Sequence, residues 1–463
     1  MCRKLSVIAF LSCLLAGCRS PFPDIPPVPA YRPAPVLPED DIPAGNHPLL
    51  ADGTPVPELT ETLGLDACIR VALRYHRRTR IADRQVLIAM DEVEETRREN
   101  WPKASAEANW EVYSQDPAGG SDLDSATGRL SLTVPVYDFG RTTYRARALS
   151  LQADATALTA KRVRQTLAVD VSRAYFRVLE AEKILDVVKE SIRVLTEQVE
   201  VSRNLLDQGL VARNDVLAAE VQLAQRKQER IAAENNVRLS RASLNRLMGL
   251  SVMAELDLHD VREADLWEGR LPALFQAAIQ NRPDLSSLNH RIRAIQTGIR
   301  AAYAHLTPDI VAFGSYDARL DEPNPERDWF TAGIGVQIPF FQGGQTLVRV
   351  RRLRRELEQA VDRRNERADD VLFEVRQEFL NVEEAREQIP VARKNIQLAD
   401  ENLSVVRDQY NQGLVTHTDV LIEENRLTQA RSSYFQALYG YHRSLAQLRH
   451  VVAGSLPGGS EEE

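Results

Sequence analysis

Apolar residues recur along much of the chain at alternating intervals of three and four positions. The stretch from Thr142 to Asp207 contains no proline or glycine, and one seam keeps this spacing over several heptads. The seam consists of Val171, Ala174, Val178, Ala181, Leu185, Val188, Ile192, Leu195, Val199, Ser202 and Leu206. A sustained heptad is typical of coiled-coil packing, and about 65 helical residues span roughly 100 Å. We therefore expect one very long helix, ended by Gly209 and followed by a returning helix from Asp215 to about Met248.

Two other regions alternate apolar and polar residues with a period of two, which is typical of β-strands. From Ala104 to Val112 every second residue is apolar, and the residues between them are polar. A segment rich in Gly, Asp and Ser (115–127) separates this run from a second alternating one, which predicts a hairpin at 103–138. A similar, less regular arrangement predicts a second hairpin at 309–341. Each hairpin would have one apolar and one polar face.

The two halves of the chain repeat each other at an offset of 204 residues. Between 205–225 and 409–429, ten of 21 positions are identical. Pro135 and Pro339 are related by the same offset, and both fall near predicted strand ends, where a missing N–H does least harm. The chain is therefore one structural unit written twice.

The repeat divides the chain into a first unit at 58–251, a connecting segment at 252–269 and a second unit at 270–453. Each unit is expected to contain a first helix, a strand hairpin and a long helical hairpin. In the second unit the long helices are predicted at 345–411 and 416–451.

Prolines mark two expected irregularities in this pattern. The first helix of the first unit, near 60–100, should end at Trp101-Pro102. Pro390 lies inside the long helix of the second unit, where a proline costs about 3 kcal/mol and kinks the helix. Its counterpart in the first unit is Asp186, so the two helical hairpins should not curve identically.

The N-terminal residues are interpreted as an export signal. Two basic residues precede a short apolar run, and the Leu-Ala-Gly-Cys sequence ending at Cys18 resembles a lipoprotein cleavage box. Such a run is too short to span a membrane. Residues 1–17 are therefore predicted to be a signal peptide and Cys18 the lipidated N-terminus, with a plain secretory signal as the alternative. The proline-rich segment 18–57 is predicted to be an extended tether, and 454–463 a disordered tail.

The predicted strands suggest a membrane protein. Four amphipathic strands of about ten residues match the thickness of a hydrocarbon layer. Four strands cannot close a barrel, and lipid does not tolerate an open sheet edge. We therefore expect a homotrimer in which four strands per protomer close a 12-stranded membrane β-barrel, continued by an all-α coiled-coil tube. The alternative is a soluble helical bundle capped by two solvent-exposed hairpins.

Charge and composition argue against several other functions. The net charge is −8, and the 58 basic and 66 acidic residues are interspersed, which indicates solvated helix faces rather than a nucleic-acid patch. The histidines are scattered, so we expect neither a metal site nor a cofactor. No Gly-rich phosphate loop or Ser/His/Asp arrangement indicates an enzyme. The basic run at 351–355 is interpreted as a solvated face, with contact to lipid headgroups as the alternative.

Together these features resemble the TolC-like outer-membrane efflux protein family, in particular its lipidated members that serve tripartite pumps. The likeness covers 58–453 and rests on the duplicated hairpins, the long helices and the Gly-Leu-Val…Asp-Val-Leu turn in both halves. It implies a TolC-like α/β-barrel with an internal two-fold repeat. It also implies that 208–215 and 412–419 form the periplasmic tip, where the channel closes and a periplasmic adaptor protein docks.

The residues of these turns are compatible with such a tip. Gly209 and Gly413 can adopt a positive φ and so end a helix. Apolar side chains at an exposed apex would suit docking of a helical-hairpin partner. The residues predicted there are Leu210, Val211, Leu414 and Val415.

The resemblance further implies a periplasmic gate built from Asp419, Tyr410 and Asp215. Asp419 matches an acidic position that rings the closed pore, and three copies would concentrate cations at the entrance. Tyr410 matches a tyrosine whose hydroxyl ties the inner helix pair to the outer one, and Asp215 matches its partner. From the residues alone, either aspartate could instead cap the returning helix. Ile422 replaces a second acidic ring and Val415 a basic latch, so we expect a weaker gate.

The leading interpretation is a passive exit duct in the outer membrane that acts with an adaptor and an inner-membrane pump, which the resemblance implies to be of the RND type. One alternative is a lipid-anchored periplasmic coiled-coil scaffold or adaptor without a barrel. Another is an exit duct for type I protein secretion. The predicted pore-facing positions do not identify a drug, metal ion, peptide or protein as the substrate, because a wide duct selects little.

Overall fold

The structure of the chain is a computed structural model, which describes residues 62–113, 123–209, 211–261, 266–319, 328–454 and 456. Its elements in chain order are α2 (Leu65–Tyr75), α3 (Arg77–Arg98), β1 (Lys103–Tyr113), β2 (Leu123–Tyr137), α4 (Arg141–Asp207), α5 (Arg213–Met248), α6 (Leu271–Asn281), α7 (Pro283–Ala304), β3 (Asp309–Arg319), β4 (Trp329–Gln337), α8 (Gln345–Asn411) and α9 (His417–Val452). The predicted signal peptide, Cys18, the tether and most of the tail lie outside the described residues.

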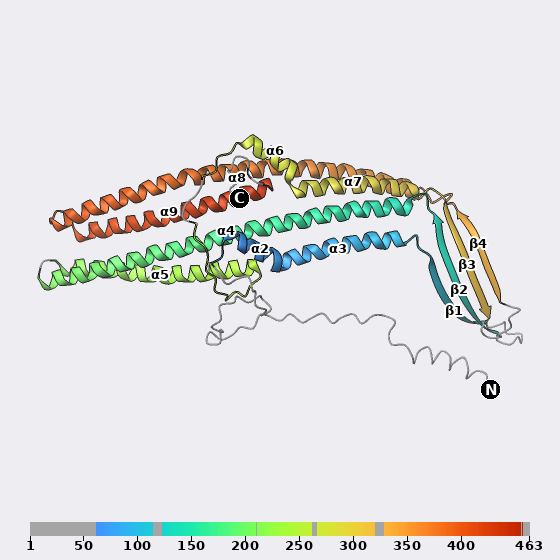
Figure 1. The fold of residues 1–463 in the computed structure, drawn as a ribbon, viewed down its shortest axis with the longest axis horizontal. Helices are drawn as coiled ribbons and strands as arrows, with labels where there is room; N and C mark the ends of the chain where they lie inside the picture. The colour runs from blue at the N-terminus through green and yellow to red at the C-terminus, as the bar shows by residue number, and fades with distance from the viewer. Residues whose placement is uncertain are drawn as a thin grey trace, which may run out of the picture.

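The molecule is long and narrow, with a β-sheet at one end and two helical hairpin tips at the other (Figure 1). The sheet is antiparallel in the order β1-β2-β3-β4, so the two predicted hairpins join into one sheet through β2 and β3. The α4–α5 and α8–α9 hairpins extend side by side away from it. This architecture confirms the predicted fold class of a four-stranded sheet joined to long paired helices.

The strand register places the alternating residues on two chemically distinct faces. Residues paired directly across a ladder share a face of the sheet. One such row joins Leu130, Tyr316 and Phe330, and the neighbouring apolar positions include Ile334, which is 74% exposed. The opposite face carries a row of hydroxyls, in which Ser105 Oγ and Ser131 Oγ lie 2.7 Å apart. The sheet therefore has one apolar face and one polar face.

The polar face also carries charged contacts between strands. Arg129 of β2 forms an ion pair with Asp317, its direct partner on β3, and Ser315 donates a hydrogen bond of 3.0 Å to the same carboxylate. The aromatic ring of Phe313 lies over Gly333, where an added Cβ would come within 3.0 Å of the ring. Polar side chains, together with aromatic residues such as Phe313 and Trp329, thus line the face that would border a pore.

Strand β2 is longer than the sequence pattern predicted. It begins at Leu123, inside the segment 115–127 that was expected to be a loop, and its pairing with β1 continues without a shift from Thr133 to Leu123. The polar composition of this segment masked the strand, because backbone pairing in a hairpin continues as long as the opposite strand provides partners.

The long helices follow the predicted heptad seam. None of the eleven seam positions on α4 is exposed, and Val171, Val178 and Leu195 are among those that are buried. They pack against α5 and α9, so α4 connects one hairpin to the other. In the second hairpin, α8 continues from Gln345 to Asn411 through Pro390 without a break.

The first helix of each repeat is interrupted, which the sequence reading did not anticipate. The expected helix near 60–100 is divided at His76, whose ψ of 136° is extended and whose Nδ1 accepts a hydrogen bond from the N–H of Arg78. In the second repeat, α6 and α7 are divided in the same way at Arg282. At the first break Gly249, the C-cap of α5, lies against the Tyr75 carbonyl, so close packing accompanies the change of direction.

The described parts of the connecting segment, 252–261 and 266–269, pack around the middle of the helices. Leu63 forms a parallel bridge with Leu258, and the Tyr175 hydroxyl donates a hydrogen bond of 2.5 Å to the His259 carbonyl. On the other side, the backbone N–H of Trp267 donates to the Tyr441 hydroxyl at 2.7 Å. These contacts attach the segment to the cores of both hairpins.

Gly249 provides a direct test of this packing. Its φ is +77°, and an added Cβ would lie 3.1 Å from the Tyr75 carbonyl oxygen. Because a side chain at this φ costs roughly 1–2 kcal/mol before the contact is counted, we expect Gly249→Ala to lower the thermal unfolding midpoint of the detergent-solubilised protein. Gly298→Ala is the matched control, since Gly298 lies within α7 with open space around its Cβ position. That change should raise stability by about 1 kcal/mol, and equal effects of the two substitutions would contradict the packing.

Within the described part of the chain, no helix is long and apolar enough to cross a membrane.

Candidate functional site

The candidate site is the pair of turns at the end of the helices farthest from the sheet (Figure 1). The first tip turn, 208–215, joins α4 to α5, and the second tip turn, 412–419, joins α8 to α9. The structure describes both turns except for Leu210, which lies outside the described residues.

Glycines end the outgoing helices in both turns. Gly209 has φ +74° and Gly413 has φ +72°, the left-handed conformation that favours glycine. The N–H of Gly413 donates to the Tyr410 carbonyl and the N–H of Leu414 to the Gln409 carbonyl, both at 2.9 Å. This is the paired arrangement that satisfies the last carbonyl groups of a helix. The repeated Gln-Gly-Leu-Val sequence therefore encodes a helix stop.

The two aspartates begin the returning helices as caps. The Asp419 carboxylate accepts hydrogen bonds from the Thr416 N–H at 2.8 Å and from the Thr416 hydroxyl at 2.7 Å. In the first tip turn the Asp215 carboxylate accepts a hydrogen bond from the N–H of Ala212 at 3.3 Å, and Ala212 has no hydroxyl to donate a second one. The hydrogen bonds from Thr416 hold the pKa of Asp419 below its usual range. The second cap is thus more fully bonded, and Asp419 is ionised at neutral pH.

The apolar residues predicted at the apex differ in exposure. Leu414 is 69% exposed, whereas Val211 and Val415 are half-buried. Ile422, one turn into α9, is 45% exposed. The free apolar surface of the second tip turn is therefore centred on Leu414 rather than on Val415.

A buried histidine lies between the two hairpins, next to the predicted gate residues. His417 begins α9 and is only 2% exposed. One of its ring nitrogens lies 2.7 Å from the side-chain amide of Gln198 on α4, and its ring centroid is 5.5 Å from that of Tyr410 on α8. The Asp215 carboxylate of α5 acts electrostatically on both rings. His417, on α9, therefore lies close to side chains of α4 and α8 and within the electrostatic influence of α5.

The structure thus places His417 beside Tyr410, within the electrostatic influence of Asp215, and the predicted gate role of Tyr410 and Asp215 stays a prediction. Burial, and secondarily the Asp215 charge, raise the pKa of Tyr410, so its phenol is protonated at neutral pH. The sequence reading missed His417. The repeat offered one clue, because the two units differ at this position: the first has Arg213, which is exposed, where the second has His417.

Apolar contacts support the same region. Leu195 and Val199 of α4, Ala219 of α5 and Leu421 of α9 form one small core that joins the hairpins. Leu403, Val420 and Leu427 form a second core within the α8–α9 hairpin, against which Tyr410 packs. Both cores are small, and each lies within about four turns of the tip. Their limited burial implies that the tip opens more readily than the middle of the molecule.

The burial of His417 predicts that the tip is sensitive to pH. Burial lowers the pKa of His417 below 6.5, and the Asp215 charge only partly opposes this. An opened tip would bind the proton more readily than the closed one, so closed-tip stability is complete above about pH 6.5 and is lost as pH falls below that value. We expect hydrogen exchange in 412–428, corrected for its intrinsic pH dependence, to increase several-fold between about pH 7.5 and 5.5.

Two substitutions separate this effect from general acid sensitivity. His417→Gln should abolish the extra exchange at low pH, because glutamine does not titrate and can still pair with Gln198. His305→Gln, at the sheet end of α7, should leave it unchanged. If the pH dependence persisted in His417→Gln, another group would have to be responsible.

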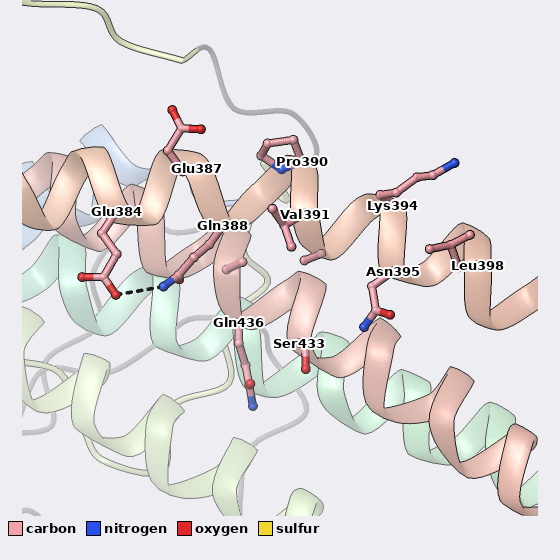
Figure 2. A pocket seen from close by; sticks show the side chains of 12 residues that line it. Glu384, Glu387, Gln388, Pro390, Val391, Lys394, Asn395, Leu398, Ser433 and Gln436 are labelled. Atoms are coloured by element: carbon pink, nitrogen blue, oxygen red, sulfur yellow. Dashed lines mark hydrogen bonds between the residues drawn. The ribbon is translucent and has the colours of Figure 1, made fainter.

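A groove on the second hairpin lies beside Pro390. It has a volume of about 1090 Å³ and lies between α8 and α9. Figure 2 shows Val391, which is 70% exposed, and Ser433 along its length, with Gln388 donating a 3.0 Å hydrogen bond to Glu384. The proline lacks an N–H to continue the helix hydrogen bonds at this level. Asp186 occupies the equivalent position on α4, so the missing N–H is a feature of the second repeat at this level.

Among the described residues, no group of three or more His, Cys, Asp or Glu side chains is placed to hold a metal ion.

Comparisons with known proteins agree on one family. A sequence model of the Outer membrane efflux protein family matches residues 79–250 and 274–454, which correspond to the two repeats. The alkaline protease secretion protein AprF of Pseudomonas aeruginosa is 24% identical over 340 residues, covering 71% of this chain and 69% of AprF. The outer membrane protein TolC of Escherichia coli strain K12 is 24% identical over 394 residues, covering 78% of this chain and 76% of TolC.

Solved structures show the same fold at lower identity. Crystal structures of CusC, described in terms of folding and transmembrane channel formation, match with a TM-score of 0.75 at 18% identity, covering 92% of this chain and 99% of CusC. The open state of the MtrE outer membrane channel of Neisseria gonorrhoeae matches with a TM-score of 0.70 at 18% identity, covering 94% of this chain and 99% of MtrE.

Proposed function

The chain belongs to the Outer membrane efflux protein family, and from this premise we propose that three copies form an exit duct through the outer membrane. The observation that carries the proposal is the sheet: one apolar face, one polar face and two unpaired edges, directly joined to long helical hairpins. An apolar outer face suits lipid, and open edges in lipid require strands from other copies. Substrates would pass along the polar face and through the helical tube.

In this proposal the duct is passive and receives its substrates from an inner-membrane pump, of the RND type, through a periplasmic adaptor. Family members are channels rather than enzymes, and a duct of this kind needs no catalytic group. The division into repeats at 58–251 and 270–453 explains how one chain provides two hairpin tips to a trimer. Lipidation at Cys18 would anchor the N-terminus of each copy in the membrane.

We assign the gate to the second tip turn. Asp419 of three copies would form a ring at the periplasmic entrance, and its low pKa favours a charged ring at neutral pH. Tyr410 and Asp215 would hold the two hairpins in the closed arrangement. Leu414 is the most exposed apolar residue described at the tips and is assigned to adaptor docking, together with Gly209, Val211, Gly413 and Val415. Leu210 is included by its equivalence to Leu414 in the repeat.

Conductance of the purified protein in a planar bilayer tests both the duct and its gate. Wild type should show small, cation-preferring openings. Asp419→Asn removes the charge but can still accept hydrogen bonds, and we expect it to reduce the cation preference by about twofold or more. Thr416→Val is the matched control, because it removes a hydrogen bond to Asp419 and leaves the carboxylate charged.

The outcomes separate the competing functions. No insertion by folded protein would reject the duct and favour a lipid-anchored periplasmic scaffold or adaptor. Conductance with equal ion preference in wild type and Asp419→Asn would keep the duct and reject the Asp419 ring.

Protein secretion is a second candidate for the cargo. AprF is described as an alkaline protease secretion protein, and a similar protein of Dickeya chrysanthemi, PrtF, as a proteases secretion protein. Another relative, from Aggregatibacter actinomycetemcomitans, is described as a toxin and drug export protein. Complementation of a strain that lacks its own exit duct, scored separately for drug resistance and for secreted protease, would assign the cargo class.

A further inference from the structure

Helices α3 and α8 lie at the two edges of the helical layer next to the sheet. In this layer α3 packs on α4, α4 on α7 and α7 on α8 (Figure 1). The strands attached to them, β1 after α3 and β4 before α8, are the two edge strands of the sheet. Each side of the molecule therefore has an unpaired edge strand with an outer helix joined to it: β1 with α3 on one side, and β4 with α8 on the other.

The outer face of α3 changes charge along its length. Near the sheet it carries an acidic block of exposed residues, which are Asp91, Glu92, Glu94 and Glu95. Farther from the sheet it carries a basic block, Arg80 and Arg84, which are also exposed. Glu94 pairs with Arg98 one turn away, whereas the other three acidic residues have no ion pair among the described residues. Like charges spaced three and four apart destabilise a helix that stands alone.

Helix α8 carries the opposite pattern. It starts with a basic block of exposed residues, which are Arg349, Arg351, Arg352, Arg354 and Arg355. An acidic block, Glu358 and Asp362, follows. Arg352 pairs with Glu356 of its own helix at 3.4 Å, and Arg354 donates to the Tyr303 hydroxyl at 3.0 Å. For the remaining residues of these two blocks, the described part of the chain provides no ion pair.

The charge blocks of α3 and α8 match in their distance from the sheet as well as in the sign of their charge. α3 runs toward the sheet and α8 runs away from it, so distances are counted from the end of α3 at Arg98 and from the start of α8 at Gln345. At 1.5 Å per residue, Asp91 and Arg352 both lie about 10 Å along their helices. Arg84 lies at about 21 Å and Glu358 at about 20 Å, while Arg80 and Asp362 lie at about 27 and 26 Å.

We propose that α3 of one copy pairs antiparallel with α8 of the next copy, and that these two pairs of charge blocks set the register of the seam. The inference rests on the proposed trimer and names the surfaces that join its subunits. The acidic block of α3 would face the basic block of α8, and Arg80 and Arg84 would face Asp362 and Glu358. Pairing of α3 with α8 also places β1 beside β4, so the same contact closes the open sheet edges.

A second copy explains the pattern better than a lipid surface does. Anionic headgroups would attract the basic block of α8 but would repel the acidic blocks on both helices. A partner with alternating blocks of opposite sign satisfies all four blocks, and the described chain contains such a partner in its own other edge. Complementary charge also disfavours a seam shifted along the helices, because a shift would bring like charges together.

Charge reversal on each side of the seam tests the proposal in the full-length protein. The first variant combines Asp91→Arg with Glu95→Arg, the second combines Arg352→Glu with Arg355→Glu, and the third carries all four changes. Trimer content in mild detergent is measured by light scattering after size-exclusion chromatography, at low and high salt. Asp186→Arg with Glu200→Arg is the matched control, since both residues are exposed on α4 far from this seam.

Either two-residue variant should lower the trimer association constant at low salt by about tenfold or more. The four-residue variant should recover most of that loss, and the control should match wild type. Unchanged trimer in both two-residue variants would overturn the seam, as would a four-residue variant no better than either. Loss of binding to phosphatidylglycerol vesicles by the second variant, with unchanged trimer, would assign the basic block to headgroups instead.

Disulfide trapping covers the case in which a reversal variant fails to fold. Asp91→Cys combined with Arg352→Cys should give covalently linked copies after mild oxidation, whereas Arg80→Cys with Arg352→Cys should not, because these positions lie at different levels. Equal linking by both pairs would reject the register. A wild type that neither trimerises nor conducts would reject the proposed function itself. A conducting wild-type trimer that tolerates reversal would reject only the seam.

Discussion

Arg282→Met is expected to destabilise the protein by about 3–5 kcal/mol, because it removes one partner from a buried ion cluster. The Arg282 side chain is fully buried at the break between α6 and α7. Its guanidinium donates to Asp284 at 2.7 and 3.0 Å and to Glu374 of α8 at 2.6 Å. Arg367 of α8 bonds to the same two carboxylates, so two arginines and two carboxylates alternate around the cluster.

Without Arg282 the two carboxylates would remain partly buried with too little positive charge. Burial alone would raise the pKa of Asp284 and of Glu374, but the hydrogen bonds and charge of Arg282 outweigh it and hold both pKa values below their usual range. In wild type this stabilisation is complete above the unfolded-state pKa values near 4 and is lost as pH falls through the folded-state values. The loss caused by Arg282→Met should therefore shrink in acid, because the buried carboxylates of the variant, without the charge of Arg282, should become neutral at a higher pH than those of wild type.

Denaturant unfolding of the detergent-solubilised protein, followed by circular dichroism at about pH 7 and pH 4, measures both effects. Arg193→Met is the matched control, because Arg193 pairs with Glu190 and Glu197 on the exposed face of α4. Exposed pairs of this kind contribute about 0–1 kcal/mol. A loss for Arg282→Met as small as that of Arg193→Met, or one that grows in acid, would show that the cluster does not stabilise the fold.

The same cluster illustrates what the sequence could not predict. The heptad seam of α4 could be predicted because its members lie along one helix, and the spacing of apolar residues indicates which of them are buried. Arg282, Asp284 and Glu374 have no such local signal, since charged residues normally indicate exposure. Their pairing depends on the fold bringing together residues 92 positions apart.

The tip shows a similar division. The repeated glycines and aspartates predicted two helix turns, because the conformations of glycine and of a capping carboxylate are local properties. The burial of His417 was not predicted, since it depends on α4 of the other hairpin covering the start of α9. The strands were predicted by alternation where it is regular, and β2 was underestimated at 123–127, where Leu123 and Asp124 break the alternation.

The apolar face of the sheet gives the second large effect. Ile334 lies near the middle of β4, is 74% exposed and is paired with Ala312 on the apolar face. If this face meets lipid, Ile334→Arg should destabilise the inserted protein by about 2–4 kcal/mol, the cost of an arginine near the middle of a membrane. Thr331→Arg on the same strand introduces the same charge on the polar face, opposite Ser315, where water would solvate it.

The two variants therefore place the same charge on opposite sides of one strand. Folding into lipid vesicles, followed by heat-dependent migration in gels and by urea titration, should show a large loss for Ile334→Arg and a small one for Thr331→Arg. If the sheet were instead exposed to solvent, both arginines would be tolerated, because water would solvate either face. Equal stability of the two variants would thus remove the physical basis for the barrel, while a loss confined to Ile334→Arg would identify the apolar face as the surface that meets lipid.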